Sequence, residues 1–301
     1  MEVEVCAYDD KSKAVQLPSG IEDVAMTIMR LSHEPVNINK WHLTHNNSTW
    51  VLKPDSSCGI EICSPVMRGF YGVRRVAQLI EALRTNPRVH VDCRCGFHVH
   101  FDVSDLEVEE VGTVLAWWIK AETVFLDAMP VARKKNRYCQ QIGVSSLFNS
   151  DSECAANDII HKLGWHKYHT ANTYHYVNGH RETIEFRVAE DAMCLNPDDA
   201  KNWICLLMHF IDRSLSKGMP PEYRNNNQWT GLCWLDFKDL MNLLGFEGEV
   251  AQPLADARSW FIRRLRKNMK TNMKGVWSPE VRCVSLQQLE RYVNSENLVK
   301  A

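Results

Sequence analysis

The sequence predicts an α+β protein with a largely antiparallel sheet. Short segments in which apolar and polar residues alternate indicate strands, and longer stretches with apolar residues at helical spacing indicate helices. The two kinds of segment are interspersed without the regular strand–helix–strand units of a parallel sheet. The chain has 301 residues, of which 45% are hydrophobic and 24% charged. These proportions are those of a globular protein and argue against a disordered, collagenous or coiled-coil chain.

The strands are predicted from alternation with a period of two. They fall at residues 2–5, 42–43, 49–52, 60–63, 97–103 and 183–188. The polar triplet Asn46-Asn47-Ser48 predicts a hairpin turn between two of them.

Helices are predicted from apolar stripes and from residues that cap helix ends. Stripes at 21–31 and 73–83 predict two of them. Ser104 and Glu107 have the spacing of a capping box ahead of a third stripe at 108–125. Asn196, followed by Pro197 and two acidic residues, predicts the start of a helix that runs to about Lys217.

A boundary is predicted near Gly218-Met219-Pro220-Pro221. Residues 1–218 then form a main domain, and 219–301 form a mostly helical extension. One helix of the extension carries a basic stretch, for which a solvated helix face is the simpler interpretation and a phosphate or partner contact the alternative. Its residues are Arg263, Arg264, Arg266, Lys267 and Lys270.

Composition also limits the function classes. The net charge is −2, so no strong field favours nucleic acid or an anionic membrane. No apolar run reaches the 18 residues needed to span a bilayer, and the opening Met1-Glu2-Val3-Glu4 is not that of a signal peptide. With an odd count of eleven cysteines, we expect reduced thiols and a cytoplasmic location. Cys93-Arg94-Cys95 is more typical of two strand residues than of half a zinc site.

Four predicted strands share one chemical feature. Each has an apolar face, and its opposite face carries acids, imidazoles or a guanidinium. These polar residues are Glu2 and Glu4, Glu61 and Cys63, His98 and His100, and Thr183, Glu185 and Arg187. Taken singly, each pair is commonly a solvated face, a structural histidine pair or a cross-strand ion pair. Together in one sheet they would form an acidic surface that needs cations, and carboxylates with an imidazole suit Mg²⁺ or Mn²⁺.

Three segments resemble hallmark segments of the putative amidoligase family, in the same order. They are Gly59-Ile60-Glu61-Ile62-Cys63-Ser64-Pro65, Cys95-Gly96-Phe97-His98-Val99-His100 and Thr183-Ile184-Glu185-Phe186-Arg187. The opening Glu2-Val3-Glu4 is similar to the first strand of that family, and the stretch from Trp50 to Ser57 resembles its W…DxS segment. The family belongs to the carboxylate–amine ligase superfamily, with glutamine synthetase and glutamate–cysteine ligase.

The resemblance implies a curved antiparallel sheet with helices on its outer face, and ATP with Mg²⁺ or Mn²⁺ on the concave side. Residues 1–218 would be the catalytic domain. It implies that an acid is phosphorylated by ATP and then attacked by an amine. The acid and the amine could be amino acids, peptides, polyamines or a protein side chain.

The resemblance also assigns roles to single residues. The implied metal ligands are Glu2, Glu4, Glu61, His98 and Glu185. Arg187 would contact the transferred phosphoryl group, and Glu185 and Arg187 are the implied catalytic pair. Candidates for contact with the nucleotide or a substrate anion are His100, Ser64, Arg133, Lys134 and Arg137.

Two other classes stay open from the residues. One is a metal-dependent enzyme such as a cupin-type oxygenase or a metallohydrolase, in which His98 and His100 hold a single ion. The other is an inactive relative that binds without catalysis. A second metal site at His166, His169 and His175 has no standard ligand spacing, so a polar loop is the simpler interpretation. Cys139 and Cys194 lack a cysteine-protease signature, and no serine-hydrolase, P-loop or Rossmann motif is present.

Overall fold

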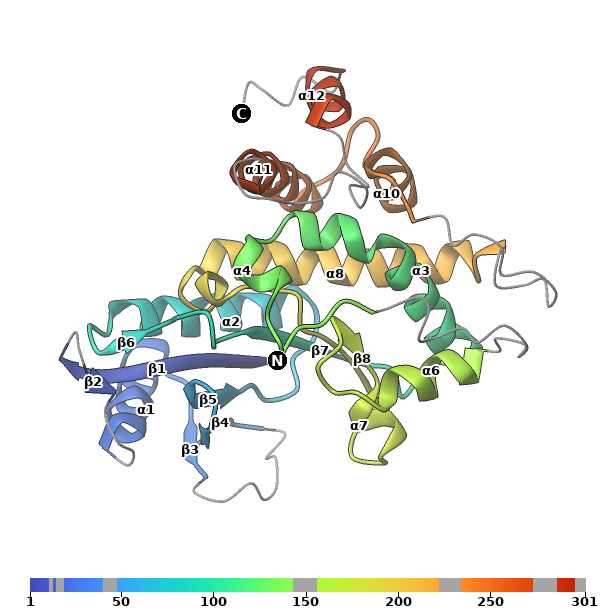
Figure 1. Ribbon diagram of the computed structural model, residues 1–301. Helices are drawn as coiled ribbons and strands as arrows, with labels where there is room; N and C mark the ends of the chain where they lie inside the picture. The colour runs from blue at the N-terminus through green and yellow to red at the C-terminus, as the bar shows by residue number, and fades with distance from the viewer. Residues whose placement is uncertain are drawn as a thin grey trace. The chain divides into compact units, whose positions relative to one another are not determined.

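The predicted α+β class is confirmed by the fold. A computed structural model describes residues 1–10, 13–14, 19–39, 48–142, 156–221, 234–272 and 286–295 (Figure 1). The chain divides into two compact units. Unit 1 consists of Met1–Val99 and Ala189–Ile204, and unit 2 of His100–Val188 and Cys205–Ala301. The predicted boundary near Gly218 and the specific likeness to glutamine synthetase stay predictions.

Unit 1 is built on a mixed sheet. Its strands lie in the order β3 (Val36–Ile38), β4 (Trp50–Asp55), β5 (Gly59–Cys63), β1 (Glu2–Asp10) and β7 (Phe97–Asp102). Two short strands, β2 (Lys13–Ala14) and β6 (Val89–His90), also pair with β1. The pairing of β3 with β4 is parallel, and the other pairs described in this unit are antiparallel. The last residues of β7, from His100 on, belong to unit 2.

Two helices of unit 1 pack against each other and one of them also against the sheet. They are α1 (Ser19–Ser32) and α2 (Gly69–Thr85), and a short 3₁₀ turn, η1 (Asp191–Leu195), completes the unit with the start of α8. The predicted apolar stripes are buried at Val24, Ile28, Val76 and Ile80. Leu31, in the last turn of α1, belongs to the predicted stripe but is exposed.

Unit 2 combines a short strand pair with most of the helices. Strand β8 (Ala171–Asn172) is antiparallel to β9 (Thr183–Phe186), which neighbours β7. The helices are α3 (Val108–Asp127), α4 (Val131–Lys134), α6 (Ala156–Gly164), α7 (Tyr174–Val177), α8 (Pro197–Lys217, from Cys205), α10 (Phe237–Leu244), α11 (Leu254–Asn272) and α12 (Leu286–Ser295). Helix α3 contacts α6, α10 and α11, and α12 contacts α10 and α11 (Figure 1).

The core of unit 2 is aromatic. The Trp118 ring stacks on Phe125 and meets Phe186 edge-on, with centroids 4.8 and 4.6 Å away. Phe210 and Phe261 extend this cluster from α8 and α11. The apolar face of β9 is therefore fixed by aromatic packing, which turns Glu185 to the opposite face of the strand.

The predicted starts of two helices have different outcomes. The prediction of a capping box that starts at Ser104 is wrong. Helix α3 begins at Val108, and its capping box is formed by Glu107 as the N-cap residue and Glu110 three residues later. The Glu110 carboxylate accepts a hydrogen bond from the Glu107 N–H at 2.9 Å, whereas the Ser104 N–H donates to Asp102 in the preceding turn. The start of α8 is confirmed, since Asn196 Oδ1 accepts from the Asp199 N–H at 3.1 Å.

The predicted solvated face of the basic stretch is wrong at one residue. Arg264 on α11 is buried, and its Nε donates to the Ala128 carbonyl at 3.4 Å. Burial lowers the pKa of Arg264 to about 10. Arg266 instead pairs with Glu290 on α12 at 2.7 Å. The predicted strand at 42–43 and most of the turn at Asn46-Asn47-Ser48 lie outside the described residues. No helix in the described ranges is long and apolar enough to cross a membrane.

Candidate functional site

The strand register of unit 1 aligns the predicted polar residues. In the antiparallel pair β1–β5, Glu4 lies directly opposite Glu61. In the pair β1–β7, Glu2 lies directly opposite His98. The residues between them, including Val3, Ile62 and Phe97, are fully buried on the other face. Apolar burial on one face thus sets the register and brings three carboxylates and an imidazole to the other.

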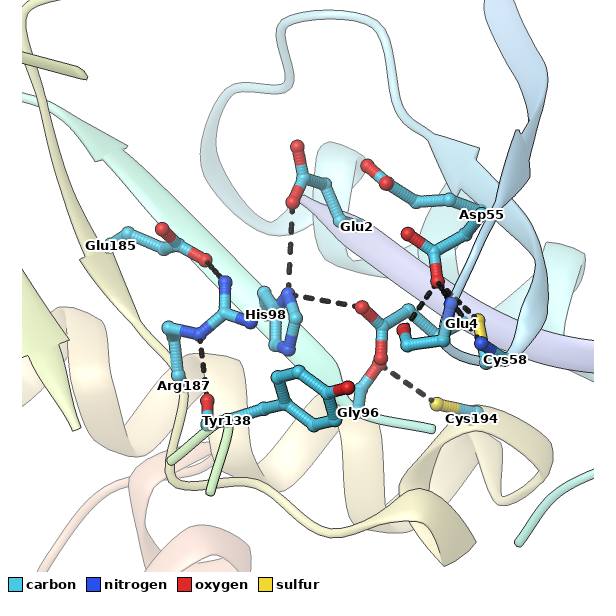
Figure 2. Close-up of polar contacts among 12 residues, drawn as sticks. Glu2, Glu4, Asp55, Cys58, Gly96, His98, Tyr138, Glu185, Arg187 and Cys194 are labelled. Atoms are coloured by element: carbon cyan, nitrogen blue, oxygen red, sulfur yellow. Dashed lines mark hydrogen bonds and ion pairs between the residues drawn. The ribbon is translucent and has the colours of Figure 1, made fainter. Parts of the chain in front are cut away.

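His98 lies between two of these carboxylates (Figure 2). Its Nδ1 is 3.6 Å from Glu2 Oε2 and 3.8 Å from Glu4 Oε1. His98 and Glu4 are buried, and Glu2 is half-buried. Carboxylates held this close in partly desolvated surroundings repel each other unless a cation or a proton offsets the charge. We call Glu2, Glu4, Glu61 and His98 the acidic cluster of unit 1.

Lys53 is a charged partner that the sequence did not single out. It lies opposite Glu61 in the β4–β5 pair, and its Nζ is 2.9 Å from Glu61 Oε1. Burial raises the pKa of Glu61 to about 7, nearby Glu2 adds to the rise, and Lys53 opposes it. Burial alone would lower the pKa of Lys53, but Glu61, Cys63 and Glu2 together raise it. The alternation of β4 could have revealed Lys53, because Lys53 and Asp55 share a face of that strand.

Asp55, from the W…DxS segment, organises the turn between β4 and β5. Its Oδ1 accepts hydrogen bonds from the N–H groups of Ser57 at 2.7 Å and Cys58 at 3.0 Å. Burial would raise the pKa of Asp55, but these hydrogen bonds lower it. The carboxylate is therefore ionised and fixes the turn that sets the register of Glu61.

Unit 2 holds a second polar cluster, around Glu185 on β9. On the neighbouring strand β8, Asn172 lies opposite Glu185, and the Asn172 Nδ2 group donates to Glu185 Oε2 at 3.0 Å. Arg187 pairs with Glu185 Oε1, and His100 Nε2 is 3.8 Å from the same oxygen. Glu185 is 3% exposed, so its charge is held by a guanidinium and an amide rather than by water. We call Asn172, Glu185, Arg187 and His100 the β9 cluster.

Arg187 is held in place from several sides. Its Nε donates to the Tyr138 carbonyl at 3.2 Å (Figure 2). Its guanidinium lies 5.8 Å from the centroid of the Tyr168 ring. Its backbone N–H donates to the Thr170 carbonyl at 2.8 Å. The Nη2 group of buried Arg133 donates to the Arg187 carbonyl. Arg133, predicted to bind an anion, therefore also supports the backbone at Arg187.

The other predicted anion contacts are placed as follows. Lys134 pairs with Asp127 at 2.5 Å. Arg137 is exposed and stacks on the Tyr138 ring at 4.7 Å. Ser64 follows β5 directly, and its N–H donates to the Met1 carbonyl at 2.9 Å. Their roles toward a nucleotide or substrate stay predictions.

The remaining histidines and cysteines that the sequence singled out lie outside the two polar clusters. His166 and His169 lie with ring centroids 4.9 Å apart, and burial lowers the pKa of His169 to about 4, with a smaller effect of His166. In the described part of the chain, no metal-ligand group forms among His166, His169 and His175. Cys139 and Cys194 are both buried. The pair Cys93 and Cys95 is not in a strand as expected, because the chain turns there and buries only Cys95.

The donor atoms of the acidic cluster suit a hard divalent cation. Three carboxylates and one imidazole offer mainly oxygen ligands, which Mg²⁺ and Mn²⁺ prefer. Burial and nearby Glu2 raise the pKa of Glu61, so a cation bound beside this carboxylate would favour its ionised form. The β9 cluster, by contrast, already carries its own cation in Arg187.

Comparison with known protein families shows to which family the chain belongs. The model of a family described as "putative amidoligase enzyme" matches residues 31–211. The chain belongs to this amidoligase family. The match includes the segments of Glu61, His98, His100, Glu185 and Arg187 but begins after β1, so Glu2 and Glu4 lie outside it. No curated protein and no solved structure matches this chain with significance.

Proposed function

We propose that this member of the amidoligase family is an ATP-dependent carboxylate–amine ligase that works through an acyl phosphate. The observation that carries the proposal is the register of unit 1, which aligns Glu4 with Glu61 and Glu2 with His98 in a chain of this family. A carboxylate is a poor electrophile because its leaving group is poor, and phosphorylation corrects this.

The proposed reaction has two steps. An oxygen of the substrate carboxylate attacks the γ-phosphorus of ATP and releases ADP. An unprotonated amine then attacks the acyl carbon, forms the amide bond and releases phosphate. The phosphate departs with one oxygen that came from the acid.

In this proposal, one set of residues binds the metal ions and Arg187 stabilises the transferring phosphoryl group. Glu2, Glu4, Glu61 and His98 would hold Mg²⁺ or Mn²⁺, with Glu185 as a further ligand on the family pattern. Bound divalent cations supply positive charge that offsets the phosphates of ATP. Arg187 is oriented by Glu185, by the Tyr138 carbonyl and by the Tyr168 ring, so that its guanidinium is ready to stabilise charge on a transferring phosphoryl group.

A single ion held mainly by histidines, as in a cupin-type oxygenase or metallohydrolase, is less well supported. The neighbours of His98 in unit 1 are the carboxylates of Glu2 and Glu4. That environment favours a hard cation over the redox metals bound by imidazole clusters.

The test is ADP release from Mg²⁺–ATP with panels of carboxylates and amines. We expect release that needs both an acid and an amine, and a loss of at least about 100-fold in Glu61→Gln and in Glu185→Gln. The matched control is Glu81→Gln, which changes an exposed carboxylate paired with Arg84 on α2. Normal turnover by Glu185→Gln would contradict the assignment.

The double variant tests whether both clusters serve one reaction. Residues that act as a unit have non-additive effects on rate. Glu61→Gln combined with Glu185→Gln should therefore be about as slow as the slower single variant. Multiplied losses would instead indicate two independent contributions.

A further inference from the structure

Three cysteines from separate segments of unit 1 meet in its interior as free thiols. Cys6 lies on β1, Cys58 in the turn before β5, and Cys95 in the loop before β7, and all three are at most 4% exposed. The Cys6 and Cys95 Sγ atoms are 3.6 Å apart, and Cys58 packs against them. Asp92 joins this group, with Oδ2 at 3.8 Å from Cys6 Sγ.

We propose that Cys6, Cys95 and Asp92 form a three-ligand binding site for a thiophilic divalent cation of the Zn²⁺ class, with Cys58 packed beside it. The site is distinct in chemistry from the acidic cluster, because its ligands are mainly sulfur.

The spacing of the donor atoms supports this geometry. Two sulfur ligands at about 2.3 Å from a tetrahedral Zn²⁺ lie about 3.8 Å apart, and a sulfur and an oxygen ligand lie about 3.5 Å apart. The observed separations are 3.6 Å between the two sulfurs and 3.8 Å between sulfur and carboxylate oxygen. Ligand atoms of Cys6, Asp92 and Cys95 all lie within 4.8 Å of one another.

The local backbone also resembles that of a structural zinc site. Asp92 and Cys95 are separated by two residues, the spacing of the paired thiolates in many zinc sites, with a carboxylate in the first position. The Cys95 N–H donates to the Asp92 carbonyl at 2.9 Å, and the Arg94 N–H donates to Asp92 Oδ1 at 2.9 Å. This turn holds both ligands in place.

Charged groups also lie beside the proposed ligands. The Arg94 guanidinium donates to Asp92 Oδ2 at 2.6 Å, lies 3.8 Å from Cys6 Sγ, and is half exposed. A site with two thiolates and a carboxylate carries net negative charge once Zn²⁺ is bound, and Arg94 offsets it. Cysteines that served only to pack the apolar core would not need charged groups beside their sulfur atoms.

The experiment is a titration of the reduced full-length chain with Co²⁺, followed by displacement with Zn²⁺. We expect one Co²⁺ per chain to give the visible bands of tetrahedral Co²⁺ and a sulfur-to-metal charge-transfer band in the near ultraviolet. Zn²⁺ should abolish these bands at stoichiometric concentration, whereas excess Mg²⁺ should leave them unchanged.

Variants locate the site. Cys95→Ala should lose the charge-transfer band. Asp92→Asn, at a half-buried residue, should keep the band with at least about tenfold weaker affinity for Co²⁺. Cys205→Ala, at a buried cysteine of α8, is the matched control and should bind as the wild type does. A wild-type chain without the band, or a Cys95→Ala chain that keeps it, overturns the proposal. Glu61→Gln should retain the band, so the outcome is independent of the ligase assignment.

Discussion

Replacing Glu122 by glutamine should change how the stability of the chain depends on pH. Glu122 lies on α3 in unit 2 and is 0% exposed. Its Oε1 accepts hydrogen bonds from the Ile142 N–H at 2.9 Å and from the Thr170 hydroxyl. Burial raises its pKa from 4.5 to about 8, and these hydrogen bonds counteract only part of the rise. The folded protein therefore carries this carboxyl group protonated at neutral pH.

The sign and size of the effect follow from the two pKa values. The folded pKa is above the unfolded one, so the stabilising contribution is complete below about pH 4.5 and is lost as the pH rises through 8. The difference between 4.5 and about 8 corresponds to roughly 4 to 5 kcal/mol of unfolding free energy. Glu122→Gln keeps the shape and the Oε1 acceptor but cannot ionise, so this pH dependence should disappear.

Urea unfolding at pH 5, 7 and 9 measures how the free energy of unfolding depends on pH. We expect the wild type to lose stability between pH 5 and 9, and Glu122→Gln to lose several kcal/mol less. The control is Glu81→Gln, at an exposed carboxylate, whose pH profile should follow the wild type. Equal pH slopes in wild type and Glu122→Gln would refute the assignment of a protonated carboxyl group.

Three further perturbations test separate parts of the structure. Phe186→Ala should lower the free energy of unfolding by about 3–5 kcal/mol, because Phe186 is fully buried against Trp118; a melting temperature near that of the wild type would contradict this packing. Asp236→Ala should cost about 1 kcal/mol, since Asp236 caps α10 by accepting from the Asp239 N–H at 2.8 Å; unchanged urea unfolding would show that the cap contributes nothing. Arg187→Ala should slow ADP release more than it weakens ATP binding, measured by equilibrium dialysis, and equal losses would indicate a binding role only.

The sequence was sufficient to predict which face of a strand is polar where apolar and polar residues alternate clearly. Alternation placed Glu2 and Glu4, Glu61, and His98 on the polar faces of β1, β5 and β7, and the register confirms that placement within unit 1. Alternation has this power because the side-chain period of a strand is two, so one buried face determines the other.

Contacts between distant segments could not be predicted in this way. The Lys53–Glu61 pair needs two local features together, the alternation of β4 and the turn at Asp55 that sets the register of β4 against β5. The burial of Arg264 depends on the carbonyl of Ala128, more than a hundred residues away in sequence. At Ser104 the local pattern was misleading, since Glu107 and Glu110 satisfy the same capping geometry three residues later.

The most direct test of the proposed ligase chemistry follows an oxygen atom. Once the acid and amine that support ADP release are known, the acid is prepared with ¹⁸O in its carboxylate and turned over with Mg²⁺–ATP. The acyl-phosphate route predicts one ¹⁸O in the released phosphate for each amide formed, measured by mass spectrometry. Phosphate that carries no label while the amide accumulates would contradict the account.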